Sequence, residues 1–232
     1  MEKQMKNNES SCSPEQKLDY KKEYKDLYLP KPQPTVIQVP PIPFIMVDGR
    51  GNPNDKTGEY ADAVGLLYAL TYTIKMSGKG KQVPPGYFAY VVPPLEGLWW
   101  LAGGNETEGH FSEKDQYCWT AMIRQPAFVT EEILEQARIE VRRKKPALDS
   151  TKARLMTYEE GLCIQMMHLG AYDEEPRSLE LMEQFMEAQG LRHAIGDLGP
   201  NGMVKRHHEI YLNDPTKTAP DKLKTVLRHP VK

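Results

Sequence analysis

The spacing of apolar residues predicts alternating strands and helices along most of the chain. Apolar positions that alternate with polar ones are typical of half-buried strands, whereas apolar positions three or four residues apart are typical of amphipathic helices. Helical spacing occurs over residues 18–28, 58–76, 130–143 and 177–188. Strand-like segments cover residues 36–47, 87–92, 98–101, 116–124, 161–169 and 207–212. The mixture predicts an α+β fold.

Turn and cap residues refine several of these elements. Prolines at 40, 41 and 43 predict that segment 36–47 is an edge strand, which enters a turn at residues 48–51. The connection Pro93-Pro94-Leu95-Glu96-Gly97 is of the kind that joins two hairpin strands. Thr130, followed by two glutamates, is a good helix N-cap.

The order strand, glycine turn, helix, strand occurs twice, and its glycines, Gly49 and Gly170, lie about half the chain apart. We therefore expect two tandem, pseudo-symmetric modules, at about 35–145 and 150–232. Each should have an antiparallel sheet with helices on one face, which leaves a ligand cleft between the modules. A polar tail at 1–16, expected to be disordered, and a short docking helix with a proline-rich linker at 17–34 precede them.

Composition excludes several classes of protein. Hydrophobic residues make up 39% of the 232 residues and charged residues 27%, so a folded core is expected. The net charge of -2 shows no basic excess, so nucleic acid is not an expected partner. Three cysteines without a CxxC pair indicate neither disulfides nor a zinc site, and suit a reducing compartment. Without an apolar leader or a membrane-length apolar segment, we expect a cytoplasmic protein that does not enter membranes.

The last predicted strand carries the strongest candidate chemistry. With period-two alternation, His207, Glu209 and Tyr211 point one way, while His208 and Ile210 point the other. The apolar side can then pack on helices, and Glu209, flanked by a phenol and an imidazole, can face a cleft. Spacing alone leaves a solvated outer face as the alternative.

Aromatic residues supply the candidate walls of that cleft. Trp99 and Trp100 are adjacent on a strand, so only one of them can face the cleft, whereas Tyr117 and Trp119 share a face. The alternative for each residue is core packing, since aromatic side chains supply much of the buried area in any domain. The total of three tryptophans and twelve tyrosines favours an aromatic cleft.

Met166 and His168 share one face of a further strand and are candidate ligand contacts, with a structural histidine as the alternative. The pair His207-His208 lacks the i, i+4 spacing of a helical metal site, and no third ligand is evident, so no metal is predicted. Cys118 and Cys163 lie within apolar strands, where an inert buried thiol is expected.

Several segments resemble the GyrI-like family, whose fold also forms the drug-sensing domain of AraC-type and MerR-type regulators. The resemblance extends over nearly the whole chain, and its most specific part is the segment that contains Glu209. It implies a stand-alone member, since no helix-turn-helix domain is evident, and it implies hydrolysis of cyclopropane-bearing natural-product alkylators. The matching segments are residues 22–28 (KEYKDLY), 48–53 (DGRGNP), 72–76 (YTIKM), 160–165 (EGLCIQ) and 207–215 (HHEIYLNDP).

Two functions are therefore consistent with the sequence. As an enzyme, the protein would stack a planar aromatic substrate against tryptophan and tyrosine, while Glu209 deprotonates a water and Tyr211 assists; no cofactor is required. As a binding module, it would capture planar aromatic or cationic molecules without turnover. Inhibition of a topoisomerase is a weaker third hypothesis, because the near-neutral charge offers no broad acidic surface. The sequence predicts neither the physiological substrate nor the oligomeric state.

Overall fold

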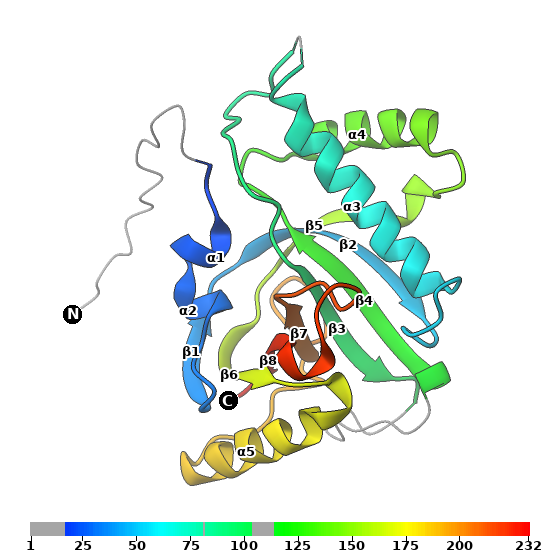
Figure 1. Ribbon diagram of the computed structural model, residues 1–232. Helices are drawn as coiled ribbons and strands as arrows, with labels where there is room; N and C mark the ends of the chain where they lie inside the picture. Colours follow the sequence, from blue (N-terminus) through cyan, green and yellow to red (C-terminus); the bar gives the residue numbers. More distant parts are fainter. Residues whose placement is uncertain (1–16, 81, 104–113) are drawn as a thin grey trace, which may run out of the picture.

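A computed structural model describes residues 17–80, 82–103 and 114–232, so the predicted disordered tail at 1–16 lies outside the described residues (Figure 1). The fold is α+β, as predicted, with one curled antiparallel sheet of eight strands in the order β1-β6-β8-β7-β3-β4-β2-β5. The strands are β1 (Thr35–Val39), β2 (Ile42–Arg50), β3 (Leu95–Leu101), β4 (Tyr117–Arg124), β5 (Arg154–Tyr158), β6 (Gly161–Leu169), β7 (His207–Tyr211) and β8 (Lys224–Pro230). The helices are α1 (Tyr20–Glu23), α2 (Lys25–Tyr28), α3 (Glu59–Ser77), α4 (Glu131–Lys144) and α5 (Glu175–Ala188).

The sheet has two similar halves that meet at β3 and β7. Strands β1 and β2 have 5 and 9 residues, and β5 and β6 repeat these lengths. The halves exchange their first strands, because β1 pairs with β6 and β5 pairs with β2. Hydrogen bonding between β3 and β7 then joins the halves into one continuous sheet. Gly97 and Glu209 form the central pair of the β3–β7 ladder, and so lie at the boundary between the two halves.

Helices cover one face of the sheet at its two ends. In Figure 1, α3 and α4 lie above the central strands, and α5 lies below them. Apolar residues of α3 and α4 pack on β2, β3 and β4, while Met182 and Met186 of α5 pack on Ile164 and Met166 of β6. As predicted, Thr130 caps α4 by accepting a hydrogen bond from the Ile133 amide. The middle of this face, over β3 and β7, is left open between the helices.

The opposite face of the sheet is covered by α1, α2 and the segment around residues 87–90. Tyr28 and Tyr90, both almost fully buried, pack there against Phe44, Met46 and other apolar side chains of the sheet. Aromatic side chains supply a large share of the area buried in this layer, which therefore closes the second face of the sheet.

The segment at 36–47 forms two strands instead of one. Pro40 and Pro41 separate the two strands. Of these two, β1 lies at an edge of the sheet as predicted, whereas β2 lies between β4 and β5. The turn predicted at 48–51 starts late, because Asp48 to Arg50 still belong to β2. Gly51, with a φ of 106°, makes the actual change in direction.

Segment 87–92 forms no strand of the sheet, so the predicted hairpin with residues 98–101 is wrong. Its backbone instead makes one short bridge, in which the Leu18 amide donates to the Ala89 carbonyl at 2.9 Å and the Val91 amide to the Leu18 carbonyl at 2.7 Å. The neighbours of β3 are β4 and β7. Strands β5 and β8 were not predicted. In β8 the buried Arg228 and His229 interrupt the apolar pattern that marks a strand.

Candidate functional site

A cleft of about 1080 Å³ lies over β3 and β7, between α3 and the start of α5. The face of β7 that looks into it presents His207, Glu209 and Tyr211, as the alternation of the sequence predicts. The sheet forms the floor of the cleft and the two helices form its sides. A pocket of this size over a sheet is the usual setting for a small-molecule ligand.

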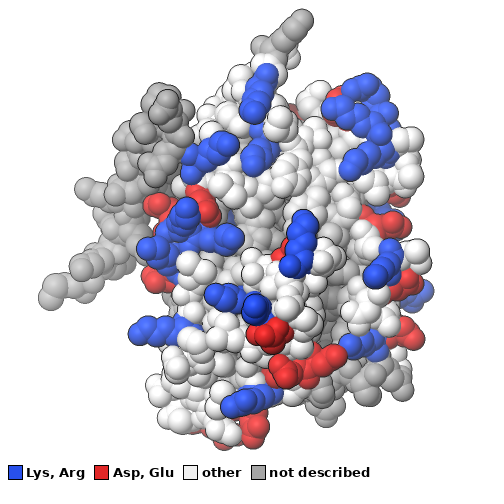
Figure 2. Space-filling model, in the orientation of Figure 1, with Lys and Arg blue, Asp and Glu red and all other residues white. Residues whose placement is uncertain are grey.

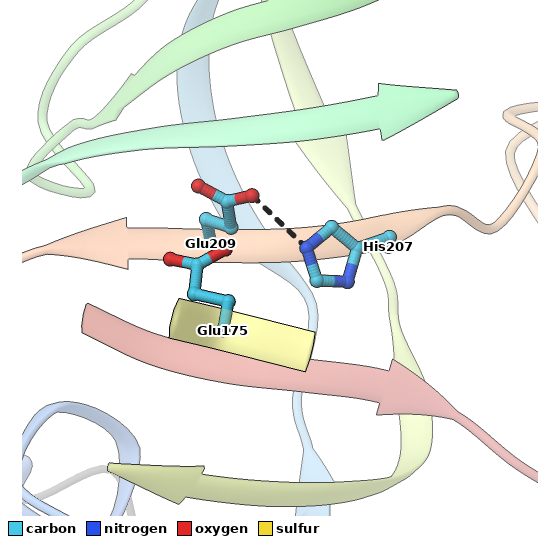
Figure 3. Close-up of side chains that lie close together, drawn as sticks. All are labelled: Glu175, His207 and Glu209. Atoms are coloured by element: carbon cyan, nitrogen blue, oxygen red, sulfur yellow. Dashed lines mark hydrogen bonds and ion pairs between the residues drawn. The ribbon is translucent and has the colours of Figure 1, made fainter. Parts of the chain in front are cut away.

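Glu209 is held at the floor of the cleft by two neighbours on its own strand. Its Oε1 lies 3.0 Å from Nε2 of His207 (Figure 3). Its Oε2 accepts a hydrogen bond of 2.7 Å from the Tyr211 hydroxyl. The Glu209 side chain remains 14% exposed. A carboxylate has about four lone-pair positions, so these two contacts leave acceptor capacity for a water or a ligand.

Aromatic rings form the wall beside Glu209. The Trp99 indole donates a hydrogen bond of 2.9 Å to the Tyr211 hydroxyl, which links the wall to the carboxylate. The Trp99 ring also packs on Tyr60, at 5.3 Å between centroids, and edge-on against Tyr117 at 5.8 Å. From the side of α5, Tyr172 packs edge-on against Tyr211. The wall therefore presents aromatic faces to a small molecule in the cleft.

Gly97 leaves the space that the Trp99 indole and the Tyr211 hydroxyl occupy. It lies directly across the ladder from Glu209, and a Cβ there would meet Nε1 of Trp99 at 2.7 Å and the Tyr211 hydroxyl at 3.3 Å. A side chain at position 97 would therefore displace the hydrogen bond from the Trp99 indole to Tyr211. Glycine is required by this close approach and not by its backbone angle.

The tyrosine hydroxyls of the site have raised pKa values. Burial, and then the Glu209 carboxylate, raise the pKa of Tyr211 and of Tyr60 well above the usual 10. The same two causes raise the pKa of Tyr172 to about 12. At neutral pH these hydroxyls therefore stay protonated and act as hydrogen-bond donors.

Glu175, the first residue of α5, brings a second carboxyl group next to Glu209 (Figure 3). Its residue is 8% exposed, and its buried Oε1 has no hydrogen-bond partner among the described residues. Burial, followed by the nearby Glu209 and Asp173 carboxylates, raises the pKa of Glu175 well above its usual 4.5. The Glu175 carboxyl therefore tends to keep its proton in the absence of a cation.

A buried histidine orients His207 from behind. Nδ1 of His207 lies 2.7 Å from Nε2 of His229 in β8. Burial lowers the pKa of His229 well below 6.5, and the neighbouring His207 and His193 lower it further, so His229 is neutral. This contact fixes the ring of His207 with its Nε2 toward Glu209.

Four of the predicted site residues lie in the cleft, namely Trp99, Tyr117, Glu209 and Tyr211. Within residues 17–80, 82–103 and 114–232, the other four do not line it. Trp100 points to the other side of β3, where the Arg206 guanidinium lies 4.7 Å from its ring centroid. Trp119 is fully buried behind Tyr60, against Gly49, where only a glycine leaves space for the indole.

Met166 and His168 serve packing between β6 and α5. Met166 is buried against Met182 and Met186 of that helix. His168 lies 2.9 Å from the Ser178 hydroxyl through Nδ1 and 3.0 Å from the Ala171 carbonyl through Nε2. His168 therefore has the structural contacts that were the alternative to a role in ligand binding.

The sequence did not single out Tyr172 or Glu175, and it predicted Tyr60 only as a core residue of its helix. Glu175 stands in an acidic run before Pro176, a pattern that indicates only an exposed helix start. Nothing local shows that the first residue of α5 lies beside β7. Likewise, no metal was predicted, yet one possible ligand atom from each of Glu175, His207 and Glu209 lies within 4.8 Å of the others. Glu175, the third possible ligand, comes from a different element of the fold, so spacing within β7 could not reveal it.

The fold and cleft together define a small-molecule-binding protein. The GyrI-like small molecule binding domain matches residues 32–232, and the chain belongs to that family. None of the helices in the described ranges combines the length and the apolar character needed to cross a membrane. On the face seen in Figure 2, basic and acidic side chains are interspersed, in keeping with the net charge of -2.

Solved structures from Listeria innocua are similar to this chain over nearly its whole length. One, described as a hydrolase, is 47% identical with a TM-score of 0.80 and covers 93% of this chain and 100% of its own. A second hydrolase is 47% identical, with a TM-score of 0.82, and covers 94% and 100%. A third, described as an uncharacterized conserved protein, is 48% identical, with a TM-score of 0.83 and coverage of 93% and 100%. Comparison with curated proteins gives no match.

Proposed function

We propose that the protein hydrolyses cyclopropane-bearing aromatic compounds, with Glu209 as the general base that activates water. The observation that carries this proposal is the Glu209 carboxylate itself, which is oriented by His207 and Tyr211 at the floor of an aromatic cleft. The description of two similar Listeria innocua proteins as hydrolases supports an enzyme. The cyclopropane substrate is the finer part of the proposal and comes from the resemblance stated above.

The chemistry is the addition of water across one strained carbon–carbon bond. Glu209 takes a proton from the water while the water oxygen forms a bond to the cyclopropane methylene carbon. The ring bond to that carbon breaks, and its electron pair moves through the conjugated system to a carbonyl oxygen of the substrate, which becomes a phenolate and takes a proton from solvent. Glu209 then releases the proton that it took, so the net reaction adds one water molecule to the substrate and restores the base. Ring strain already lowers the barrier, so orientation and base catalysis suffice without a cofactor.

The wall of the cleft would orient the substrate. A flat ring system stacked beside Trp99, Tyr60 and Tyr172 places its edge toward the floor, where Glu209 lies. Aromatic contacts of this kind contribute roughly 0.5–1.5 kcal/mol each beyond the area that they bury. The Tyr211 hydroxyl, already donating to Glu209, holds the carboxylate in a fixed rotamer during the reaction.

The decisive experiment compares wild type with Glu209→Gln. Glutamine keeps the shape of the side chain but cannot take the proton, so ring opening should fall by about 10² to 10⁴-fold. The assay follows the ring-opened water adduct of a cyclopropane-bearing aromatic alkylator by mass, and tryptophan quenching reports binding. Glu187→Gln, the same change at an exposed position of α5, is the matched control and should react like wild type.

A binding protein without turnover is the second candidate. Its support is the Glu209 carboxylate, which lies among aromatic rings, whereas Asp173 and Asp214 of the same cleft are paired with Lys114 and Lys217. Carboxylates and aromatic faces together attract organic cations. If wild type gives no adduct above the buffer rate while quenching shows tight binding, the hydrolase proposal is wrong. If Glu209→Gln is as fast as wild type, the choice of base is wrong.

A further inference from the structure

The cleft floor contains a three-residue cluster that the proposed hydrolysis does not use as a unit. Glu209 and His207 project from β7, and Glu175 projects toward them from the start of α5 (Figure 3). One ligand-type atom of each residue lies within 4.8 Å of the other two. Each atom is an imidazole nitrogen or a carboxylate oxygen, the donors that divalent transition metals take in proteins.

Glu175 gives an independent reason to expect a cation. Glu175 is only 8% exposed, which makes it 92% buried. Its Oε1 has no hydrogen-bond partner within the described part of the chain. A buried polar atom without a partner costs about 1–3 kcal/mol, and more if the group is charged. The Glu209 oxygens beside it can accept a proton from Glu175 but, when ionised, have none to donate. A cation between the two carboxylates would satisfy both.

The surroundings of the cluster match those of metal ligands. Nδ1 of His207 is engaged by Nε2 of His229 at 2.7 Å, which leaves Nε2 of His207 as the atom that faces the carboxylates. Oε2 of Glu209 accepts from the Tyr211 hydroxyl at 2.7 Å, which leaves Oε1 for the cluster. Outer contacts of this kind fix the orientation of metal-binding side chains and increase their affinity.

We propose that Glu175, His207 and Glu209 form a binding site for a divalent transition metal ion of the zinc type. One nitrogen and two oxygens suit Zn²⁺ and Co²⁺ better than Ca²⁺ or Mg²⁺. Bonds of about 2.0–2.2 Å place tetrahedral ligand atoms roughly 3.4 Å apart. His207 and Glu209, at 3.0 Å, are already that close, so Glu175 would approach them by roughly 1 Å, within the reach of glutamate rotamers. The fourth position opens into the cleft, so a bound water would face any ligand there.

The metal site goes beyond the proposed hydrolysis and does not depend on it. Oε1 of Glu209 cannot be a metal ligand and a free base at once, so an ion at the site replaces base catalysis by this carboxylate. The hydrolysis assay is therefore run with a chelator present, and metal binding is measured without substrate. Ring opening that is absent both with and without the chelator counts against the hydrolase proposal alone, and the absence of metal binding counts against this proposal alone.

The experiment uses chelator-treated protein without a histidine tag. Titration with Co²⁺ should give the visible absorption of four- or five-coordinate cobalt with an end point at one ion per chain, and Zn²⁺ should displace it. Glu175→Gln, which keeps the shape of the side chain, should weaken binding by at least about 100-fold, since it removes a ligand and not only an outer contact. Glu187→Gln on the same helix should bind like wild type.

Two results would overturn the proposal. One is wild-type protein that shows neither Co²⁺ absorption nor heat of Zn²⁺ binding beyond that of the buffer. The other is equal affinity in wild type, Glu175→Gln and His207→Asn. If Glu175→Gln fails to fold, the His207→Asn variant decides the matter, because asparagine keeps much of the polarity and removes the ligand nitrogen.

Discussion

Strand β7 carries a histidine–carboxylate arrangement on each of its two faces, and the two differ in the further partners that surround them. On the cleft face, His207 contacts Glu209. On the buried face, Nδ1 of His208 lies 3.1 Å from both carboxylate oxygens of Glu160, and Nε2 lies 3.1 Å from Oε2 of Glu96. Adjacent residues of one short strand thus enter two different electrostatic environments.

The buried arrangement is closed by further partners. Arg228 donates to Glu160 at 3.2 Å and, through its other nitrogen, to the Leu27 carbonyl at 2.7 Å, which ties α2 to the sheet. The Tyr28 hydroxyl donates to Glu96 at 3.3 Å. This network joins β7, β8 and the first helices of the described chain, so its role is structural.

The cleft arrangement, in contrast, ends at Glu175, whose Oε1 has no partner among the described side chains. A polar cluster that is complete holds a fold together, whereas one that is open on one side has capacity for a ligand. The difference teaches that burial and charge alone do not mark a functional site. Glu175 adds an unsatisfied atom that lies in the lining of the cleft, which the buried atoms without partners elsewhere in the described chain, such as Nε1 of Trp119, do not.

The largest expected effect breaks the buried arrangement. Glu160→Gln leaves His208 and Arg228 with one carboxylate fewer in a place without solvent, which should lower the free energy of unfolding by about 3–5 kcal/mol. Glu209→Gln, at the cleft, should change it by less than about 1 kcal/mol. Urea unfolding of both variants measures the contrast. Equal losses would mean that the two faces are not distinct in role.

A pH series should show the same contrast. Although burial lowers the pKa of His208, Glu160 and Glu96 raise it from 6.5 to about 9. A raised histidine pKa stabilises the fold fully below pH 6.5, and this contribution is lost as the pH rises through 9. Despite burial, His208 and Arg228 lower the pKa of Glu160 below 4.5, so its contribution is present above pH 4.5 and is lost on further acidification.

Urea unfolding between pH 6.5 and 9 should therefore show a falling free energy of unfolding, and Glu160→Gln should flatten that fall. Glu187→Gln, an exposed change, should keep the wild-type dependence. A wild-type stability that is constant over this range would contradict a charged His208.

Gly97→Ala changes β3, the neighbour of β7, on the face that lines the cleft. The new Cβ would meet the Trp99 indole nitrogen at 2.7 Å, so we expect a loss of about 1–3 kcal/mol in stability and weaker binding of planar ligands. Gly65→Ala in α3 is the matched control, since its Cβ has no neighbour nearer than 4.0 Å. Thermal unfolding should show that the control gains up to about 1 kcal/mol.

The smallest expected effect separates the two adjacent tryptophans. Trp99→Phe removes the hydrogen bond to Tyr211 and part of the cleft wall, so a planar ligand should bind more weakly by about 0.5–1.5 kcal/mol. Trp100→Phe, on the opposite side of β3, should leave the affinity unchanged. Fluorescence titration of both variants measures the difference. A larger loss in Trp100→Phe would place the ligand elsewhere.

The sequence by itself determined the elements whose signals are local. The bounds of β6, the cap of α4 and the alternation of β7 follow from residue periods and caps within each segment. The same alternation predicted that Glu209 and Tyr211 share a face. Their catalytic roles stay predictions, since no geometry of a free protein tests turnover.

Only the tertiary structure decided which segments meet. The exchange of β1 and β5 between the halves, the burial of Arg228 in β8 and the position of Glu175 beside Glu209 join residues that are distant along the chain. Side-chain period tells which face a residue takes on its own strand, but it carries no information on what covers that face. For that reason Trp99 lines the cleft while Trp119, its partner across the ladder, lies buried behind Tyr60.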